Sequence, residues 1–465
     1  MIDRSIAGIM RMFSLLFVLL LARQAWLVVV EGPHLDADPH NPRAHTTAAG
    51  RGAILASDGT PLAASRGESR VYPFGPVLAQ TIGYASARYG ASGLEGAYDR
   101  ILEPPQQSGD VMAEIAQVFD LLRGRSRALR GSDIVTTLEP RIQNALFGAL
   151  ARYPRAAGVV LDPRSGAVLA MASVPSYDPN TLDRSWSALG ADAQSPLLNR
   201  ATEGLYPPGS TFKVFTASTA LDAGVVTPAS TFSDPGYFAV GNAVIHDDEG
   251  EATGVEDLAG AFARSSNVDF AQIALAIGVP RFYDYLDRWK FGQTMHFQLP
   301  IQYDRFSPQG QVYDGILAQM GFGQADVLVT PLQMALVAAT IADGGIEPRP
   351  YIERGVAGPE GISSATRPGE LAEPISADTA AEMKNLMVGV VTRGTGTAAA
   401  IAGVSVAGKT GTATNPSGRA HAWFIAFAPA EQPTIALAIV VENAGYGGAI
   451  AAPIARRVIQ AALTK

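Results

Sequence analysis

The chain has 465 residues, of which 47% are hydrophobic, and its 35 basic and 43 acidic side chains give a formal net charge of −8 at pH 7. The acidic balance and the lack of any basic run exclude the usual electrostatic pattern of a nucleic-acid-binding protein. Cysteine is absent, which excludes disulfides, cysteine nucleophiles and thiolate metal sites. At this length we expect two or three folded domains.

The N-terminal segment predicts a membrane anchor. Residues 12–30 are a largely apolar stretch, close to the ~20 residues that span a bilayer. No small-residue cleavage site follows cleanly, so we expect an uncleaved signal anchor rather than a removed signal peptide. Because Arg4 and Arg11 precede the stretch and acidic residues follow it, the positive-inside rule predicts a single-pass membrane protein with its bulk outside the cytoplasm.

Three regions are expected along the chain. Residues 1–31 are assigned to a cytoplasmic tip and the anchor, residues 32–132 to a small elongated α+β module, and residues 133–465 to the main domain. Within the module, residues 51–63 predict two short strands around an Asp-Gly turn, and residues 110–122 predict a helix.

Arg51 and Glu95 are candidates for a structural ion pair inside this module.

The sequence of the main domain predicts an α+β fold. Before its largely helical middle stretch we expect a strand at 133–138, a helix at 139–153 and a hairpin at 158–174. After that stretch we expect strands at 404–414, 422–428 and 434–441 and a helix at 450–463. Strands first, helices in the middle, and strands with a helix last predict an antiparallel sheet covered by helices.

Two of only five lysines in the chain lie in short motifs, and Lys213 closes the first of them, three residues after Ser210. Arginine supplies most of the positive charge elsewhere, and only lysine can lose its proton to act as a base. Residues 206–209 cannot be helical, so Ser210 is expected to begin a helix, with Lys213 one turn further on the same face. A neutral Lys213 would activate the serine hydroxyl. The alternative is a capping serine followed by an exposed lysine.

The second motif is the only Ser-x-Asn sequence of the chain, Ser265 to Asn267. Ser265 is a candidate for relaying a proton between the two motif lysines and a leaving amine. Asn267 is a candidate for holding a substrate amide or Lys213. Alone, such a sequence is more often a turn or a helix cap, and only the other motifs favour a catalytic role.

The third motif, Lys409, Thr410, Gly411 and Thr412, falls in a predicted strand. Gly411 is expected where another backbone approaches closely. The alternation of a strand places the two threonine hydroxyls on one face, while Lys409 must reach the cleft from the other. Such an edge can bind a terminal carboxylate, while the N–H groups of Thr412 and Ser210 form an oxyanion hole. The alternative is a glycine bulge in a surface strand.

Residues 246–249, His-Asp-Asp-Glu, are side chains of the types that bind metal ions, but adjacent side chains rarely converge on one ion. We therefore expect a solvated loop near the cleft. The six histidines show no metal-ligand spacing, so neither a metal nor a cofactor is expected.

The three motifs, in this order, resemble those of penicillin-recognising serine enzymes. A wider likeness to class B penicillin-binding proteins extends over nearly the whole chain, through residues 51–63, 70–73, 93–96, 173–180, 199–201, 321–324, 330–331 and 421–424. The resemblance implies a monofunctional D,D-transpeptidase whose Ser210 attacks the penultimate D-Ala of a peptidoglycan stem peptide and is acylated by β-lactam antibiotics. It also implies a SEDS-type membrane glycan polymerase as partner.

Two other functions stay open. A class D-like β-lactamase would share the first and third motifs, but it should be shorter, lack the N-terminal module and usually lack an asparagine at position 267. A non-catalytic β-lactam sensor or scaffold is disfavoured by the intact motifs. A bifunctional enzyme is disfavoured because the first ~130 residues leave no room for a glycosyltransferase domain. Elongation, division and sporulation all remain open as pathways.

Overall fold

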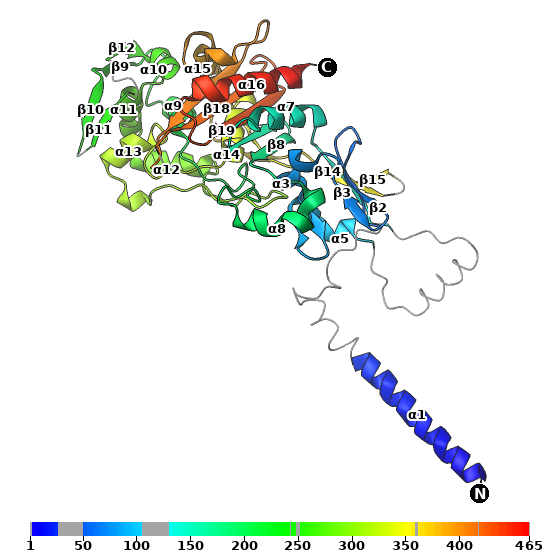
Figure 1. The fold of residues 1–465 in the computed structure, drawn as a ribbon. Coiled ribbons are helices and arrows are strands. Elements are labelled where there is room, and N and C mark those ends of the chain that lie inside the picture. The colour runs from blue at the N-terminus through cyan, green and yellow to red at the C-terminus, as the bar shows by residue number, and fades with distance from the viewer. Residues whose placement is uncertain are drawn as a thin grey trace.

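The structure, a computed structural model, describes residues 2–26, 50–104, 130–241, 243–247, 252–358, 361–416 and 418–464. The helix predicted at residues 110–122 lies outside these residues. Figure 1 shows the chain from helix α1 at the N-terminus to helix α16 at the C-terminus.

Helix α1 (Ile2–Trp26) overlaps the stretch predicted to cross the membrane. Large apolar side chains along it, among them Phe13, Phe17 and Leu20, are exposed. Within the described ranges, we find no helix whose length and apolar character suffice for a membrane span. The last four residues of the predicted stretch, 27–30, lie outside the described ranges, and the single-pass anchor stays a prediction.

A six-stranded sheet in the order β15-β14-β6-β1-β2-β3 combines strands of the N-terminal module with strands of the main domain. Its strands are β1 (Ile54–Leu55), β2 (Pro61–Arg66), β3 (Ser69–Val71), β6 (Asp133–Thr136), β14 (Glu353–Gly358) and β15 (Gly361–Ala365). Strands β1 and β2 form the predicted hairpin, whose turn needs Gly59 at a φ of +84°. Strands from both sides of residue 132 therefore share one sheet.

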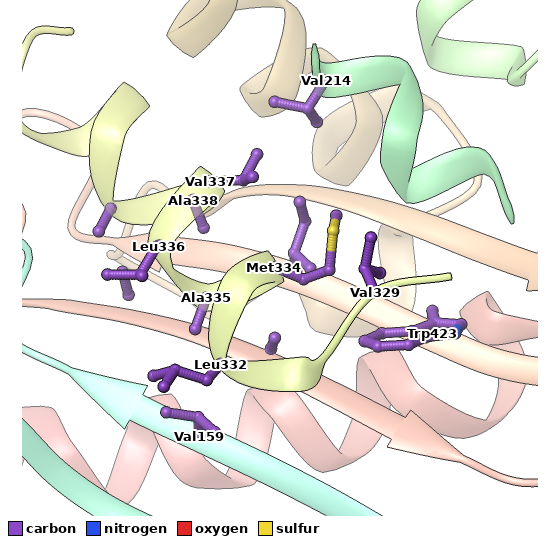
Figure 2. Packing of buried hydrophobic residues seen from close by; sticks show 14 of the residues in the cluster. Val159, Val214, Val329, Leu332, Met334, Ala335, Leu336, Val337, Ala338 and Trp423 are labelled. Atoms are coloured by element: carbon purple, nitrogen blue, oxygen red, sulfur yellow. The ribbon is translucent and has the colours of Figure 1, made fainter. Parts of the chain in front are cut away.

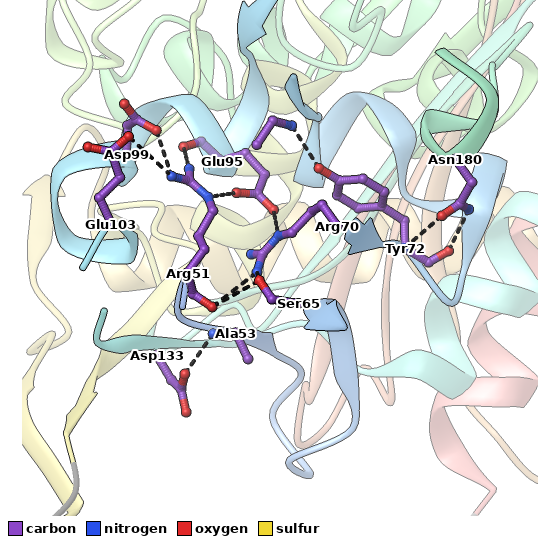
Figure 3. Close-up of polar contacts among 11 residues, drawn as sticks. Arg51, Ala53, Ser65, Arg70, Tyr72, Glu95, Asp99, Glu103, Asp133 and Asn180 are labelled. Carbon is purple, nitrogen blue, oxygen red and sulfur yellow. Dashed lines mark hydrogen bonds and ion pairs between the residues drawn. The ribbon is translucent and has the colours of Figure 1, made fainter. Parts of the chain in front are cut away.

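A buried ion cluster stabilises this module (Figure 3). Arg51 Nε donates to Glu95 Oε2 (2.7 Å), and Arg70 Nε donates to Glu95 Oε1 (2.6 Å). The Arg51 and Glu95 side chains are fully buried, so each compensates the desolvated charge of the other. The predicted ion pair is confirmed. Short elements complete the module: α3 (Ala79–Ile82), β4 (Ala85–Ser86), β5 (Gly90–Ala91), α4 (Gly93–Ala97) and α5 (Asp99–Leu102).

The central sheet has five antiparallel strands in the order β17-β18-β19-β7-β8. They are β7 (Ala156–Leu161), β8 (Val168–Val174), β17 (Ala407–Ala413), β18 (His421–Ala428) and β19 (Ile435–Val441). The predicted hairpin and the three predicted late strands are confirmed. Strand β17 lies at an edge of the sheet, where its outer backbone groups are available to a ligand.

Both faces of this sheet are buried by helices. Along β18 the side chains alternate, so Trp423 and Ile425 pack on one face and Phe424 on the other. Helices α7 (Pro140–Leu150) and α16 (Gly447–Leu463) cover the Phe424 face, and α14 (Pro331–Ala342) covers the other. Figure 2 shows α14 buried against the sheet. The predicted α+β fold with a helix-covered antiparallel sheet is confirmed.

The helical stretch between the strand groups is also confirmed. It holds α8 (Leu182–Ala191), α9 (Lys213–Asp222), α10 (Leu258–Arg264), α11 (Asn267–Ile277), α12 (Val279–Arg288), α13 (Asp314–Met320), α14 and α15 (Ala377–Arg393). Small antiparallel pairs lie beside these helices: β9 (Thr231–Asp234) with β12 (Gly254–Asp257), β10 (Tyr237–Val240) with β11 (Ala243–His246), and β13 (Glu347–Pro348) with β16 (Glu370–Ala372). In Figure 1 the β9–β12 region lies at the end of the body opposite β2 and β3.

Candidate active site

Ser210 lies in a one-turn 3₁₀ helix, η4 (Gly209–Phe212), which leads directly into α9. The prediction placed Ser210 at the start of the α-helix, whereas α9 begins at Lys213. Two prolines and Gly209, which has a φ of +52°, form a tight turn before Ser210. The first helical turn after it has the hydrogen-bond pattern of a 3₁₀ helix instead of an α-helix. Ser210 is 8% exposed and Lys213 is fully buried, so Lys213 is not the exposed lysine of the alternative interpretation.

The Lys213 amine reaches the second motif. Its Nζ donates to the backbone carbonyl of Ser265 (2.5 Å) and to Oδ1 of Asn267 (2.8 Å). The ring of Phe270 lies 5.4 Å from the same nitrogen, so an apolar wall closes this side of the amine. The structure therefore brings the first two motifs together.

Ser265 links the second motif to the third. Its Oγ accepts a hydrogen bond from Nζ of Lys409 (2.8 Å) and lies 3.3 Å from Nζ of Lys213. Lys409 is fully buried and also donates to the backbone carbonyl of Thr410 (3.1 Å). Two lysines from distant parts of the chain thus meet at one hydroxyl group.

The edge strand β17 packs directly on the serine turn. A Cβ atom on Gly411 would lie 2.7 Å from the carbonyl oxygen of Pro208, and one on Gly209 would lie 2.8 Å from that of Thr412. Both contacts are shorter than a side chain tolerates, so the expected close backbone approach is observed. The register of β17 with β18 runs without a shift, which excludes a glycine bulge.

A cleft of about 560 Å³ opens over these groups. Of the predicted residues, its lining includes Ser210, Ser265, Thr410 and Thr412. Lys213, Asn267, Lys409 and Gly411 lie behind this lining and act on it through their contacts.

Three further residues also line the cleft: Arg264, Arg393 and Tyr446. None of these three was predicted from the sequence.

Sequence reasoning also missed the support of the second motif. Asp247, expected in a solvated loop, follows strand β11 and lines the cleft, and its carboxylate accepts the backbone N–H groups of Asn267 and Val268. Burial, followed by a hydrogen bond with Asp234, raises the pKa of Asp247 to about 6. Nothing in the spacing of residues 247 and 267 signals this contact. Residues 248 and 249 lie outside the described part of the chain.

A second buried carboxyl group lies below the same motif. Burial, with the neighbouring Glu256 as the next cause, raises the pKa of Asp269 to about 7. The Glu256 carboxylate in turn accepts hydrogen bonds from Thr253 (3.1 Å) and from Arg264. The motif therefore contacts a group of carboxyl side chains from β9, β12, α11 and the residue after β11.

Comparison with known proteins agrees with this geometry. Residues 156–460 match the family model for the penicillin-binding protein transpeptidase domain, and residues 51–130 match that for the penicillin-binding protein A dimerisation domain. The chain is 38% identical to the peptidoglycan D,D-transpeptidase PbpA of Mycolicibacterium smegmatis, covering 96% of each protein. It is 30% identical to the peptidoglycan D,D-transpeptidase MrdA of Escherichia coli, covering 82% of this chain and 69% of that one.

A solved structure shares the fold. Penicillin-binding protein A of Mycobacterium tuberculosis, as its penicillin G acyl-enzyme complex, superposes with a TM-score of 0.81 at 35% identity, covering 90% of this chain and all of that one. The family match covers most of the chain, and the three motifs meet in one cleft. The chain therefore belongs to the class B penicillin-binding proteins, a family of serine-type D,D-transpeptidases.

Proposed function

We propose that this chain cross-links peptidoglycan, with Ser210 as the nucleophile that forms an acyl-enzyme with a D-Ala-D-Ala stem peptide. One observation supports the proposal most directly. At the cleft that Ser210 lines, a chain of side-chain hydrogen bonds runs through four buried or partly buried groups: Asn267, Lys213, Ser265 and Lys409. Such a chain can both remove a proton from a hydroxyl group and return it to a leaving amine without a histidine or a metal ion.

In the first step, the Lys213 amine takes the proton of the Ser210 hydroxyl while Oγ attacks the carbonyl carbon of the penultimate D-Ala. Lys409, on the same Ser265 hydroxyl, supports this role because a second cation nearby disfavours a charge on Lys213. The resulting oxyanion lies between the backbone N–H groups of Ser210 and Thr412. Their close packing through Gly209 supports this oxyanion hole.

In the second step, the tetrahedral intermediate collapses and the bond to the terminal D-Ala breaks. The departing amine takes a proton through Ser265, which lies between the two lysines. An amine of a neighbouring strand then attacks the ester carbonyl, gives up its proton along the same route and releases Ser210. A β-lactam acylates Ser210 in the same way, but its ring-opened amine stays attached and blocks the acceptor.

The Lys-Thr-Gly strand is proposed to bind the terminal carboxylate of the substrate. Thr410 and Thr412 line the cleft and offer hydroxyl groups. Lys409, which is fully buried, contributes its charge from behind them rather than a direct contact. Gly411 keeps the strand close enough to the serine turn for both to touch one ligand.

We also propose the organisation expected from the sequence, with an anchor in residues 1–31, a pedestal-like module in 32–132 and the transpeptidase domain in 133–465. The exposed apolar side chains of α1 support a membrane location. Arg4 and Arg11 before the apolar stretch support a catalytic domain outside the cytoplasm. A SEDS-type glycan polymerase as partner is supported by the family resemblance alone.

The nucleophile is tested by labelling with a fluorescent penicillin. The wild-type protein should be labelled once per chain, and Ser210→Ala should lose labelling completely because no other group carries the acyl bond. The matched control is Ser187→Ala, an exposed serine on α8 outside the cleft lining, which should label as the wild type does.

Two results would overturn the proposal. Labelling that survives Ser210→Ala would place the acyl group elsewhere. Sustained hydrolysis of nitrocefin, instead of one stoichiometric turnover, would identify a β-lactamase. Transfer of a D-Ala-D-Ala peptide onto an added amine, measured by mass spectrometry, supplies the positive test of transpeptidation.

A further inference from the structure

The turn that carries the second motif has an unfavourable backbone. Ser265 adopts the left-handed conformation (φ 69°, ψ 40°), which a residue with a Cβ atom rarely holds unless its surroundings impose it. In this conformation its carbonyl accepts the hydrogen bond from Lys213, and the next two residues start α11. Groups outside the three motifs must therefore hold the turn in place.

Two carboxylates make these contacts: Asp234 at the end of β9 and Asp247 directly after β11. Oδ1 of Asp247 accepts the backbone N–H of Asn267 and that of Val268 (3.2 Å). Oδ2 of Asp234 accepts the hydroxyl of Ser266 (3.3 Å). The N-terminal end of α11, with its positive end of the helix dipole, favours such negative partners.

The side-chain amide of Asn267 is held at both ends. Its Nδ2 donates to the backbone carbonyl of His246 (3.1 Å), the residue before Asp247. Its Oδ1 accepts from Nζ of Lys213. The end of β11 thus fixes both the backbone and the side chain of Asn267, and through it the catalytic amine.

We propose that Asp247 is a positioning residue of the active site, whose carboxylate fixes the first turn of α11 and so holds Asn267 against the amine of Lys213. This inference rests on the proposed function of Lys213 as the base. It assigns to the β9–β11 region, which none of the three motifs includes, a part in the acylation step.

The groups facing Asp247 determine how its charge responds to pH. When protonated, Asp247 donates a hydrogen bond to Asp234 at the end of β9, and a proton on the amine of Lys213 would oppose the rise in the pKa of Asp247. His246 precedes it, and the Asp269 carboxyl lies below the same turn. Because burial raises the pKa of Asp247 to about 6, the carboxylate gains a proton as the pH falls through 6 and no longer offers a charged acceptor.

The test compares the second-order rate of acylation by benzylpenicillin between pH 5 and pH 8 for the full chain and its variants. Asp247→Asn keeps the shape and a carbonyl acceptor but removes the charge. At pH 7.5 we expect a loss of roughly tenfold, the effect of weakening one charge-assisted hydrogen bond. We also expect the wild-type rate to fall more steeply below pH 6 than the rate of the variant.

The matched control is Asp257→Asn. Asp257 accepts the backbone N–H of Gly260 at the start of α10 (2.8 Å), so it repeats the chemistry of a carboxylate at a helix N-terminus. This variant should acylate at the wild-type rate throughout the pH range.

The outcomes separate the two proposals. A wild-type protein that benzylpenicillin does not acylate would refute the proposed function itself. A wild-type protein that is acylated, with Asp247→Asn equal to it in rate and in pH profile, would refute the positioning role alone. Should the variant fail to fold, the wild-type profile still decides, since a rate that is flat between pH 5 and pH 7 contradicts the inference.

Discussion

Glu347 in strand β13 is a fully buried carboxyl group away from the active-site motifs. Its Oε1 accepts a hydrogen bond from Gln333 (3.3 Å), and Oε2 has no partner among the described residues. Burial, opposed by the Gln333 bond, raises its pKa to about 8. Between the usual carboxyl pKa and pH 8 the folded state keeps a proton that the unfolded state releases, so the free energy of unfolding falls as pH rises.

Replacing Glu347 with Gln should therefore stabilise the protein at pH 8 and have little effect at pH 5. The expected gain at pH 8 is on the order of a few kcal/mol, measured as a rise in Tm by calorimetry. Asp284→Asn, at an exposed carboxylate on α12, is the control and should shift Tm little at either pH. An equal change in Tm at both pH values would show that the titration of Glu347 is not the cause.

At the same scale, the active-site side chains divide into two groups. Ser210, Lys213 and Lys409 could be identified from local sequence because the chemistry requires those residue types at those spacings. Asp247 could not, because its role depends on a contact with a turn that lies 20 positions further along the chain.

At the scale of elements, the decisive contact is that between the serine turn η4 and the edge strand β17. The two meet through backbone atoms, because a Cβ atom on Gly411 would lie 2.7 Å from the Pro208 carbonyl oxygen and 2.9 Å from Cγ2 of Thr211. The close approach of the serine turn to β17 therefore depends on the absence of side chains at Gly411 and Gly209.

Gly411→Ala should separate these elements and lower the acylation rate by penicillin about 100-fold or more, the order lost when one oxyanion-hole donor is removed. The measurement is the second-order rate of labelling by fluorescent penicillin. The control is Gly148→Ala on helix α7, where nothing lies within 4 Å of the added Cβ.

This control should keep the wild-type rate and gain up to about 1 kcal/mol of stability, since alanine favours a helix interior over glycine. A Gly411→Ala protein with the wild-type acylation rate would show that acylation does not depend on the close approach of the turn and the strand.

At the scale of the whole molecule, one sheet joins the N-terminal module to the main domain. Strands β14 and β15 join β6 and β1 in one sheet, so the N-terminal module and the main domain share backbone hydrogen bonds. The module is further linked by Asn180, whose amide exchanges two hydrogen bonds of 2.9 Å with the backbone of Tyr72 (Figure 3). A rigid connection between the module and the catalytic domain follows from these contacts.

The proposed anchor is tested on the whole chain. Full-length protein, produced in a bacterial host, should sediment with membranes and resist a carbonate wash, whereas a variant starting at residue 32 should stay in the supernatant because it lacks the apolar side chains of α1. The shortened protein, whose cleft is complete, should react with penicillin at the wild-type rate. Full-length protein released by the carbonate wash would contradict a spanning anchor.

Much of the fold could be predicted from local patterns. The apolar runs of residues 158–174 and of the three late strands reflect strands buried on both faces, and the helical spacing of residues 139–153 reflects one buried helix face. All of these elements are observed. The short strands β9 to β12 were missed, because strands of four residues with mostly exposed side chains carry little periodic signal.

The order of the three motifs is a property of the sequence. So is the choice of Ser210, Lys213 and Gly411 as candidates, because a reactive hydroxyl, an amine that can lose its proton and a close backbone approach each require a particular type of residue. The folded chain alone decided how these groups meet: Ser265 between two buried amines, β17 against the serine turn, and Asp247 beneath Asn267. These contacts join residues far apart in the chain, and only the packing of helices on a common sheet sets the distances between them.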